Sequence, residues 1–421
     1  MSAQRPLHYD ASQPLYGISF SNSTSHPFRT ALSTITTGLS NKLCIVDLTS
    51  SPNTSQSQSP YYSQHNGTSN NGATPEFSQM TQTSLNVPAT KVAWEPGESL
   101  RLDEGGRGEL VASSGDVLQI WEVAEEHERG GGGYVGNAYG GGSSWSMKNR
   151  SVLSNKAKGA HGSSPPITSF SWNRKSFNKL VSCSIDTTAT LWDINTSQAM
   201  TQLIAHDRAV YDLSWLPDSS DIFVSVGADG SLRAFDLRQL EHSTILYESA
   251  NDAPLARIAF SQKEQHMLAC FGLDDSKVLI LDMRSPGKPV AELVGHQAPL
   301  GALAWGATGP SSRSDTTGGG WLASCGDDSQ LLLYDLTAPI SSSRPASRSN
   351  FKPPPANPSP YSALSPSATP ASQRTPSPAD AVEILPSKGW TARGEVNNLA
   401  FTNSGDWLGC VSGNRMSVLP V

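Results

Sequence analysis

A triplet made of one apolar, one small and one aromatic residue recurs along the chain and dominates its hydrophobic pattern. The intervals from Trp172 to Trp215, from Trp215 to Phe260 and from Phe260 to Trp305 are 43, 45 and 45 residues long. The seven copies are Ile18-Ser19-Phe20, Val92-Ala93-Trp94, Phe170-Ser171-Trp172, Leu213-Ser214-Trp215, Ile258-Ala259-Phe260, Leu303-Ala304-Trp305 and Leu399-Ala400-Phe401. A period of this length indicates a chain built from repeated structural units.

A second signature follows the triplets: an apolar or aromatic residue, a carboxylate and an aliphatic residue. Its copies are Val46-Asp47-Leu48, Trp121-Glu122-Val123, Trp192-Asp193-Ile194, Phe235-Asp236-Leu237, Leu281-Asp282-Met283 and Tyr334-Asp335-Leu336, while Leu419-Pro420-Val421 lacks the carboxylate. Short apolar runs that end in polar turn residues lie between the two signatures, which predicts antiparallel strands. No apolar stripe is sustained at helical spacing.

The period and the strand pattern predict an all-β fold, a single seven-bladed β-propeller with disordered insertions. One four-stranded sheet cannot bury both of its faces, whereas seven radial sheets bury one another and the closed ring leaves no long edge. The last repeat supplies only three strands, so we expect residues before Leu15 to provide the fourth. The expected blades are 14–86, 87–160, 165–206, 207–250, 253–296, 299–386 and 389–421, the last closed by the N-terminal strand.

Three polar segments, 50–75, 124–150 and 338–378, interrupt the repeats. They contain too little apolar surface to offset the entropy of ordering them, so we expect disordered insertions. They fall between third and fourth strands, on what we call the long-loop face. The opposite short-turn face carries the turns between second and third strands, with Asp186, Asp229, Asp275 and Asp328. Because short turns make a rigid surface, we expect the main partner site there.

Composition excludes several classes of function. No apolar run reaches the roughly 18 residues of a membrane helix, and residues 1–10 lack the apolar core of a secretion signal. The formal net charge is −7 without a basic stripe, which argues against direct binding to nucleic acid. The nine histidines and five cysteines never gather at ligand spacing, and no phosphate-binding glycine loop occurs, so neither a metal nor a cofactor is expected. The cysteines, without CxxC, indicate buried thiols in a reducing compartment.

The blade signatures resemble those of WD-repeat proteins. In that family a histidine, a serine or threonine, an aspartate and a tryptophan form a hydrogen-bonded set within a blade, here His161, Ser182, Asp186 and Trp192. The set could be mistaken for a catalytic triad. Partial copies at His206, Ser225 and Asp229 and at His296, Ser324 and Asp328 favour a structural role, because an active site would occur once.

A narrower resemblance covers the fourth repeat and both ends of the chain. The segments that carry it are His206-Asp207, Val210-Tyr211-Asp212, 225–231, Phe235-Asp236-Leu237-Arg238, 240–244, 14–18, Glu395-Val396-Asn397-Asn398-Leu399 and Asp406-Trp407. They are similar to the family of the plant Transparent Testa Glabra protein and its animal relatives, cullin-4-associated scaffolds. The resemblance implies transcription factors, dual-specificity kinases and the cullin-4 ligase adaptor as protein partners, in nucleus and cytoplasm, with no membrane contact and a monomeric propeller.

The segment Phe235-Asp236-Leu237-Arg238, with Asp229 upstream, resembles the box by which WD-repeat receptors dock on the adaptor of cullin-4 ubiquitin ligases. An arginine at the end of a third strand could reach an acidic partner group bidentately. Leu281-Asp282-Met283-Arg284 is a weaker second copy. The alternative is that each Asp-x-Arg pair simply ends a strand as a solvated ion pair.

Five Ser/Thr-Pro pairs follow one another in the segment 338–378, where an accessible chain would suit proline-directed kinases. The candidate phosphosites are Ser359, Ser365, Thr369, Thr375 and Ser377. Phosphates there would add negative charge near one face and could alter partner choice. The alternative is ordinary low-complexity sequence, in which such pairs arise by chance.

Taken together, these patterns predict a non-enzymatic scaffold that assembles transcription regulators and protein kinases by holding several clients on one disc. A substrate receptor of a cullin-4 RING ubiquitin ligase is the alternative. A propeller enzyme would need convergent carboxylates or a metal in the central channel, and the sequence offers no such set.

Overall fold

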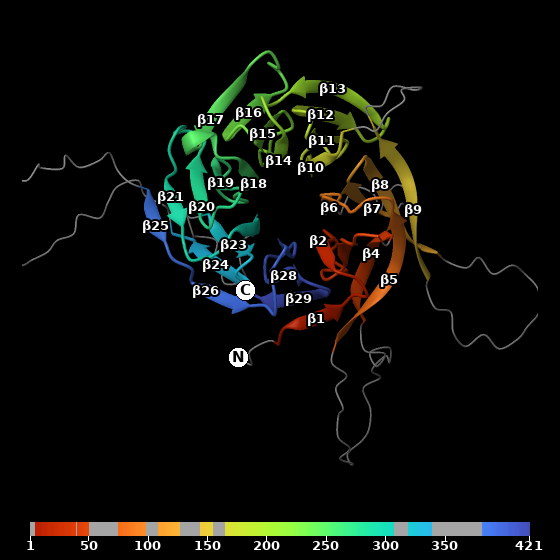
Figure 1. Ribbon diagram of the computed structural model, residues 1–421. Coiled ribbons are helices and arrows are strands. Elements are labelled where there is room, and N and C mark those ends of the chain that lie inside the picture. The colour runs from red at the N-terminus through yellow and green to blue at the C-terminus, as the bar shows by residue number, and fades with distance from the viewer. Residues whose placement is uncertain are drawn as a thin grey trace, which may run out of the picture.

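Seven sheets are arranged in a ring, which confirms the predicted all-β, seven-bladed propeller (Figure 1). The computed structural model describes residues 5–38, 40–49, 75–97, 108–126, 144–154, 165–306, 319–338 and 381–421. Inner strands of neighbouring blades contact one another around the whole ring, including those of the first and last blades. The candidate phosphosites 359–377 lie outside the described residues.

The first six blades each run from an inner to an outer strand in chain order. The first three blades contain β2 (Leu15–Phe20), β3 (Thr30–Thr34), β4 (Asn41–Thr49) and β5 (Glu76–Leu85); β6 (Lys91–Trp94), β7 (Glu109–Ser114), β8 (Leu118–Glu126) and β9 (Ser144–Leu153); and β10 (Ile167–Trp172), β11 (Lys179–Ser184), β12 (Thr188–Asp193) and β13 (Gln198–Ile204). The fourth and fifth contain β14 (Val210–Trp215), β15 (Ile222–Gly227), β16 (Ser231–Asp236) and β17 (Ser243–Glu248); and β18 (Leu255–Phe260), β19 (Met267–Gly272), β20 (Val278–Asp282) and β21 (Ala291–Leu293), with the short 3-10 turn η2 (Ala250–Asp252) between them.

The sixth blade contains β22 (Leu300–Trp305), β23 (Gly320–Gly326), β24 (Gln330–Leu336) and β26 (Lys388–Thr391). The seventh contains β27 (Asn398–Phe401), β28 (Trp407–Ser412) and β29 (Arg415–Pro420), and its outer strand is β1 (Leu7–Asp10) from the other end of the chain. Strand β1 pairs antiparallel with β29 from Leu7 opposite Val418 to Asp10 opposite Arg415. The two ends of the chain therefore share one blade, as Figure 1 shows at the bottom of the ring.

The recurrent triplets lie at the ends of the inner strands, and their burial explains their composition. In β14, Leu213 and Trp215 are buried, whereas Ser214 is partly exposed and lines the channel. The Trp215 indole Nε1 donates to the carbonyl oxygen of Ser171 in the preceding blade at 3.0 Å. Trp94 makes the same bond to the carbonyl of Ser19. In these two triplets the small central residue leaves the channel open, while the tryptophan joins adjacent blades.

The predicted insertion 124–150 was too long. Strand β8 continues to Glu126 and β9 begins at Ser144, and the pairs Ala124–Ser146 and Glu125–Trp145 belong to the ladder of the second blade. The outer strand of a blade is solvated on one side, so β9 tolerates polar residues that read as a loop in the sequence. Only residues 127–143 of this segment lie outside the described residues.

The boundary predicted between the sixth and seventh blades is also wrong. Strand β26, at 388–391, pairs with β24 and completes the sixth blade, although part of it was assigned to the seventh. The short strand β25 (Val382–Ile384) was assigned to the sixth blade but pairs in parallel with β21, as a fifth strand of the fifth blade. Such short segments carry no repeat signature, and their positions are fixed by pairing with distant strands.

Candidate functional site

The histidine, aspartate and serine of the fourth blade form a hydrogen-bonded network at the short-turn face. The Nδ1 of His206 lies 2.9 Å from Oδ1 of Asp229, and its Nε2 lies 2.8 Å from Oγ of Ser225. The neutral ring therefore donates from Nδ1 to the carboxylate and accepts at Nε2 from the hydroxyl. The His206 side chain is fully buried, and in the same blade Phe235 stacks on Phe223. The network holds a turn and leaves no room for a substrate.

The sixth blade forms the same contacts, whereas the third blade shows only part of its set within the described residues. In the sixth blade, His296 contacts Asp328 at 3.0 Å and Ser324 at 2.8 Å. In the third blade, Trp192 donates to Oγ of Ser182 at 2.8 Å, whereas His161 lies outside the described residues.

Asp186 of the third blade instead accepts hydrogen bonds from Thr188 in its own turn, from the backbone N–H at 3.1 Å and from the hydroxyl at 2.7 Å. The second blade contains a tryptophan–serine hydrogen bond that was not predicted from the sequence: Trp121 Nε1 donates to Ser113 Oγ at 2.9 Å.

Protonation of His206 should destabilise the fold. Burial lowers the pKa of His206, against the opposing effect of Asp229. Because the unfolded histidine binds a proton near pH 6.5, this group stabilises the fold above that pH and the contribution is lost as pH falls through the lowered folded value. We expect the melting temperature to fall below about pH 6.5. His206→Gln should lower the free energy of unfolding by about 1–3 kcal/mol at neutral pH. The melting temperature of this variant should depend less on pH than that of wild type.

The control for this prediction is His242→Gln, which alters an exposed histidine. Thermal unfolding followed by circular dichroism over the acidic range would compare the three proteins. If the melting temperature of His206→Gln fell with pH as steeply as that of wild type, the pH dependence could not be assigned to His206.

A buried carboxylate, that of Asp212, ties four blades together around the channel, and no motif predicted this role. Oδ1 of Asp212 accepts hydrogen bonds from the Ser169 hydroxyl at 2.5 Å and from Lys91 Nζ at 3.3 Å. Its Oδ2 accepts from the backbone N–H of Ile258 at 3.1 Å. These groups come from β6, β10, β14 and β18, so the carboxylate cross-links the inner strands of four successive blades.

A second buried charge joins the first two blades. Arg29 is 1% exposed, and its guanidinium pairs with Asp47 at 3.3 Å and with Glu109 of β7 at 2.9 Å. Trp145 of β9 covers the guanidinium, with 4.2 Å from the Arg29 Cζ to the ring centre. The cation–π contact and the two carboxylates hold Arg29 as a structural group.

The four predicted docking residues do not form one surface. Asp236 and Arg238 lie together at the long-loop end of β16, whereas Asp229 precedes β16 at its other end and belongs to the His206 network. Phe235 is 4% exposed and packs in the core. A strand of six residues spans roughly 20 Å, so it separates Asp229 from Arg238. Of the set, only Asp236 and Arg238 can meet a partner at this rim.

The Asp236–Arg238 pair presents the guanidinium in one orientation. Arg238 donates from Nε to Asp236 Oδ1 at 2.9 Å and from its backbone N–H to the same oxygen at 3.0 Å. The hydrogen bond from the Arg238 side chain lowers the pKa of Asp236 to about 2. Arg284 repeats the arrangement on Asp282 in the fifth blade, and both arginine side chains are about two-thirds exposed. Arg238 and Arg284 could each donate hydrogen bonds to a carboxylate of another protein.

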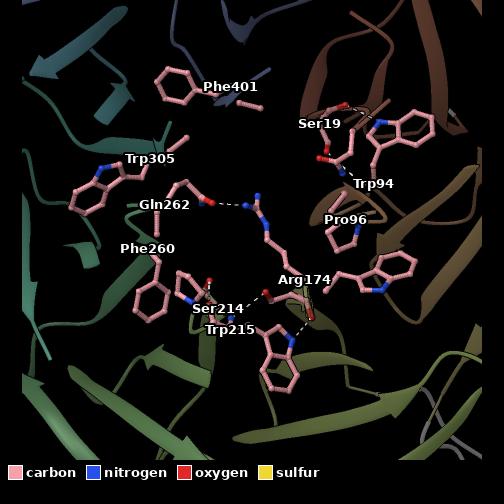
Figure 2. A pocket seen from close by; sticks show the side chains of 18 of the residues that line it. Ser19, Trp94, Pro96, Arg174, Ser214, Trp215, Phe260, Gln262, Trp305 and Phe401 are labelled. Carbon is pink, nitrogen blue, oxygen red and sulfur yellow. Dashed lines mark hydrogen bonds between the residues drawn. The ribbon is translucent and has the colours of Figure 1, made fainter. Parts of the chain in front are cut away.

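The mouth of the channel on the long-loop face forms a cavity of about 390 Å³ (Figure 2). Ends of the inner strands and the turns that follow them line it, among them Ser19, Trp94, Trp215, Phe260 and Phe401. Figure 2 shows the side chain of Arg174 stretched across the cavity toward Gln262, to which its Nη1 donates a hydrogen bond. Arg174 lies in a turn outside both repeat signatures, so no sequence pattern marked it.

The cysteines, the metal ligands and the membrane helices were also subjects of prediction. All five cysteines are buried free thiols, and burial raises the pKa of the Cys183 thiol to about 12. In the part of the chain that the structure describes, no group of three or more His, Cys, Asp or Glu residues could hold a metal ion. No described helix is long and apolar enough to span a membrane.

Known proteins share this repeat and much of this sequence. A family model described as "WD domain, G-beta repeat" matches residues 197–236 and 287–335. The DDB1- and CUL4-associated factor 7 homolog of Dictyostelium discoideum is 33% identical over 338 residues, which cover 80% of this chain and 86% of the relative.

Two yeast proteins are similar as well. A WD repeat-containing protein of Schizosaccharomyces pombe is 34% identical over 361 residues, covering 80% of this chain and 76% of its own. Another from Saccharomyces cerevisiae is 36% identical over 273 residues, covering 60% of this chain and 48% of its own. These relatives support the WD-repeat and cullin-4-associated part of the resemblance, and they do not bear on the plant Transparent Testa Glabra protein specifically.

Proposed function

Because this chain belongs to the family of WD-repeat proteins that includes the DDB1- and CUL4-associated factor 7 homolog, we propose that it is a non-enzymatic scaffold that assembles protein complexes. Its clients would be transcription regulators and dual-specificity protein kinases, in the nucleus and the cytoplasm. The scaffold works by simultaneous contact, since two clients on one rigid disc meet at a raised effective concentration.

The chemistry of the short-turn face supports a protein-binding role. Aliphatic side chains of three turns between second and third strands are exposed to solvent: Ile35 by 41%, Ile185 by 48% and Leu273 by 50%. Ile204, at the end of β13 on the same face, is exposed by 77%. Exposed aliphatic residues on rigid turns suit protein contacts, because they lose little conformational entropy on binding.

The pre-oriented arginine at the rim favours a second role, as a substrate receptor of a cullin-4 ubiquitin ligase. The name of the Dictyostelium relative couples it to DDB1 and CUL4. Asp236 already fixes the Arg238 guanidinium, whose remaining N–H groups can donate to a carboxylate of the adaptor without further ordering. We place the adaptor at the long-loop rim of the fourth and fifth blades, away from the aliphatic turns.

Replacement of Arg238 tests this placement. We expect Arg238→Ala to weaken binding to the purified adaptor about 30-fold or more, as for an interface hot spot, with an unchanged melting temperature. Arg284→Ala should weaken binding less. Surface plasmon resonance with the immobilised adaptor would measure both variants.

The matched control is Arg415→Ala. Arg415 is also held by a carboxylate, with 2.6 Å between its Nε and Oδ1 of Asp10, but it follows the β28–β29 turn on the short-turn face. The control should bind the adaptor like wild type. Unchanged binding by Arg238→Ala, or an equal loss in Arg415→Ala, would rule out the rim as the docking site.

A further inference from the structure

The guanidinium of Arg174 lies in the channel mouth, where burial lowers its pKa and the charge of nearby Asp218 partly opposes that shift. Among the residues that the structure describes, Arg174 makes no ion pair, and its side-chain partner is the neutral amide of Gln262. By contrast, Arg29, Arg233 and Arg415 are each paired with carboxylates. The guanidinium therefore retains donor groups that could bind an anion.

The turn that carries Arg174 is held rigidly in place. Oδ1 of the buried Asn173 accepts hydrogen bonds from the backbone N–H groups of Lys175 at 2.8 Å and Ser176 at 2.7 Å. Its Nδ2 donates to the carbonyl of Ser219 in the next blade at 3.0 Å. The base of Arg174 is thus fixed to two blades, and only its side chain needs to move to receive a ligand.

The charges around the mouth also favour an anion. Lys91 lies among the lining residues, and its charge is matched by Asp212. The lining residue Asp218 accepts a hydrogen bond at its carboxylate from Gln265 Nε2 at 2.6 Å, while its backbone carbonyl accepts from Lys175 Nζ at 2.9 Å. Together these groups and Arg174 leave one positive charge in excess, with Lys91, Arg174 and Lys175 set against Asp212 and Asp218, in a chain of net charge −7.

We propose that the channel mouth binds a glutamate or aspartate side chain of an extended partner peptide, with Arg174 as the residue that receives the carboxylate. On binding, the guanidinium leaves Gln262 and forms a bidentate pair with the carboxylate. A cavity of about 390 Å³ admits one or two side chains, and its aromatic and small residues provide an apolar wall for their aliphatic parts. The site lies apart from the Arg238 rim and from the aliphatic turns.

Fluorescence anisotropy with the full chain tests the proposal. The probe is a fluorescein-labelled peptide of alternating glycine and glutamate, compared with the same peptide carrying glutamine. Wild type should bind the glutamate peptide at least about tenfold more tightly, and Arg174→Gln should remove that preference. Equal binding of the two peptides to wild type, or a preference retained by Arg174→Gln, would overturn the proposal.

Two substitutions of Gln262, the resting partner of Arg174, provide a sharper test. Gln262→Glu places a carboxylate beside Arg174, so it should weaken peptide binding about tenfold. Gln262→Ala removes only the resting partner and should bind as tightly as wild type or more so. Equal effects of the two variants would contradict the role of Arg174, and unchanged thermal melting would show that both are folded.

Further arms separate this site from its neighbours. Arg238→Ala, at the rim of the fourth blade, should retain the preference for glutamate. Loss of the preference in this variant would overturn the placement. A matching phosphoserine peptide that binds through Arg174 while the glutamate peptide does not would overturn the assignment to a carboxylate. Failure of the adaptor experiment would leave these outcomes unaffected.

Discussion

Deletion of residues 1–10 should lower the melting temperature by about 10 °C or more and cause self-association. The deletion removes β1, which supplies the ladder with β29 and packs Leu7 and Tyr9 against the core between the seventh and first blades. The lost hydrogen bonds and apolar contacts together correspond to about 4–6 kcal/mol. The edge of β29 would then be exposed and free to pair with another chain.

A synthetic peptide of residues 1–14 should restore the melting temperature when added to the shortened chain, because it can re-form the missing strand. Asp10→Asn breaks only the exposed ion pair with Arg415, so it should change the melting temperature by no more than about 2 °C. Differential scanning fluorimetry and size-exclusion chromatography would follow all three cases. A shortened chain that stays monomeric and melts like the full chain would contradict closure of the ring by β1.

Replacement of Asp212 by alanine should destabilise the protein by about 3–5 kcal/mol. The carboxylate is nearly inaccessible, and its loss leaves the Ser169 hydroxyl and the Ile258 N–H without their acceptor. It also leaves Lys91 without its counter-charge in the channel. Urea unfolding at equilibrium would give the change in the free energy of unfolding.

The matched control for Asp212 is Lys91→Met, which removes a partner whose side chain is about one-third exposed. This variant should lower the free energy of unfolding by about 1 kcal/mol. The double variant should lower it by less than the sum of the two single changes. A cost below about 1 kcal/mol for Asp212→Ala would show that the four inner strands do not depend on this carboxylate.

The repeated triplets made the propeller predictable because each of their positions has one physical role. Trp215 must be large and buried between blades, and Ser214 must be small beside the channel. The same pattern in seven places gave the number of blades and the order of most strands. Strands without a repeated side-chain role, such as β9 and β25, could not be identified in this way.

The sites were less predictable because they depend on which residues meet across blades. Asp212 joins groups that are 121 and 43 residues away in the chain, and no local motif encodes those distances. Arg174 can be recognised as a candidate binding residue only in the structure, where the neutral side chain of Gln262 faces it. The separation of Asp229 from Arg238, however, could have been inferred, since the strand between them must place its two ends on opposite faces of the disc.

Native mass spectrometry of the purified chain with a dual-specificity kinase and the cullin-4 ligase adaptor tests the scaffold function most directly. The account predicts one complex that holds one copy of each of the three proteins, and Arg238→Ala should release the adaptor while the kinase stays bound. Two separate complexes that never merge, or loss of both partners from the Arg238 variant, would contradict a propeller that holds its partners on distinct surfaces.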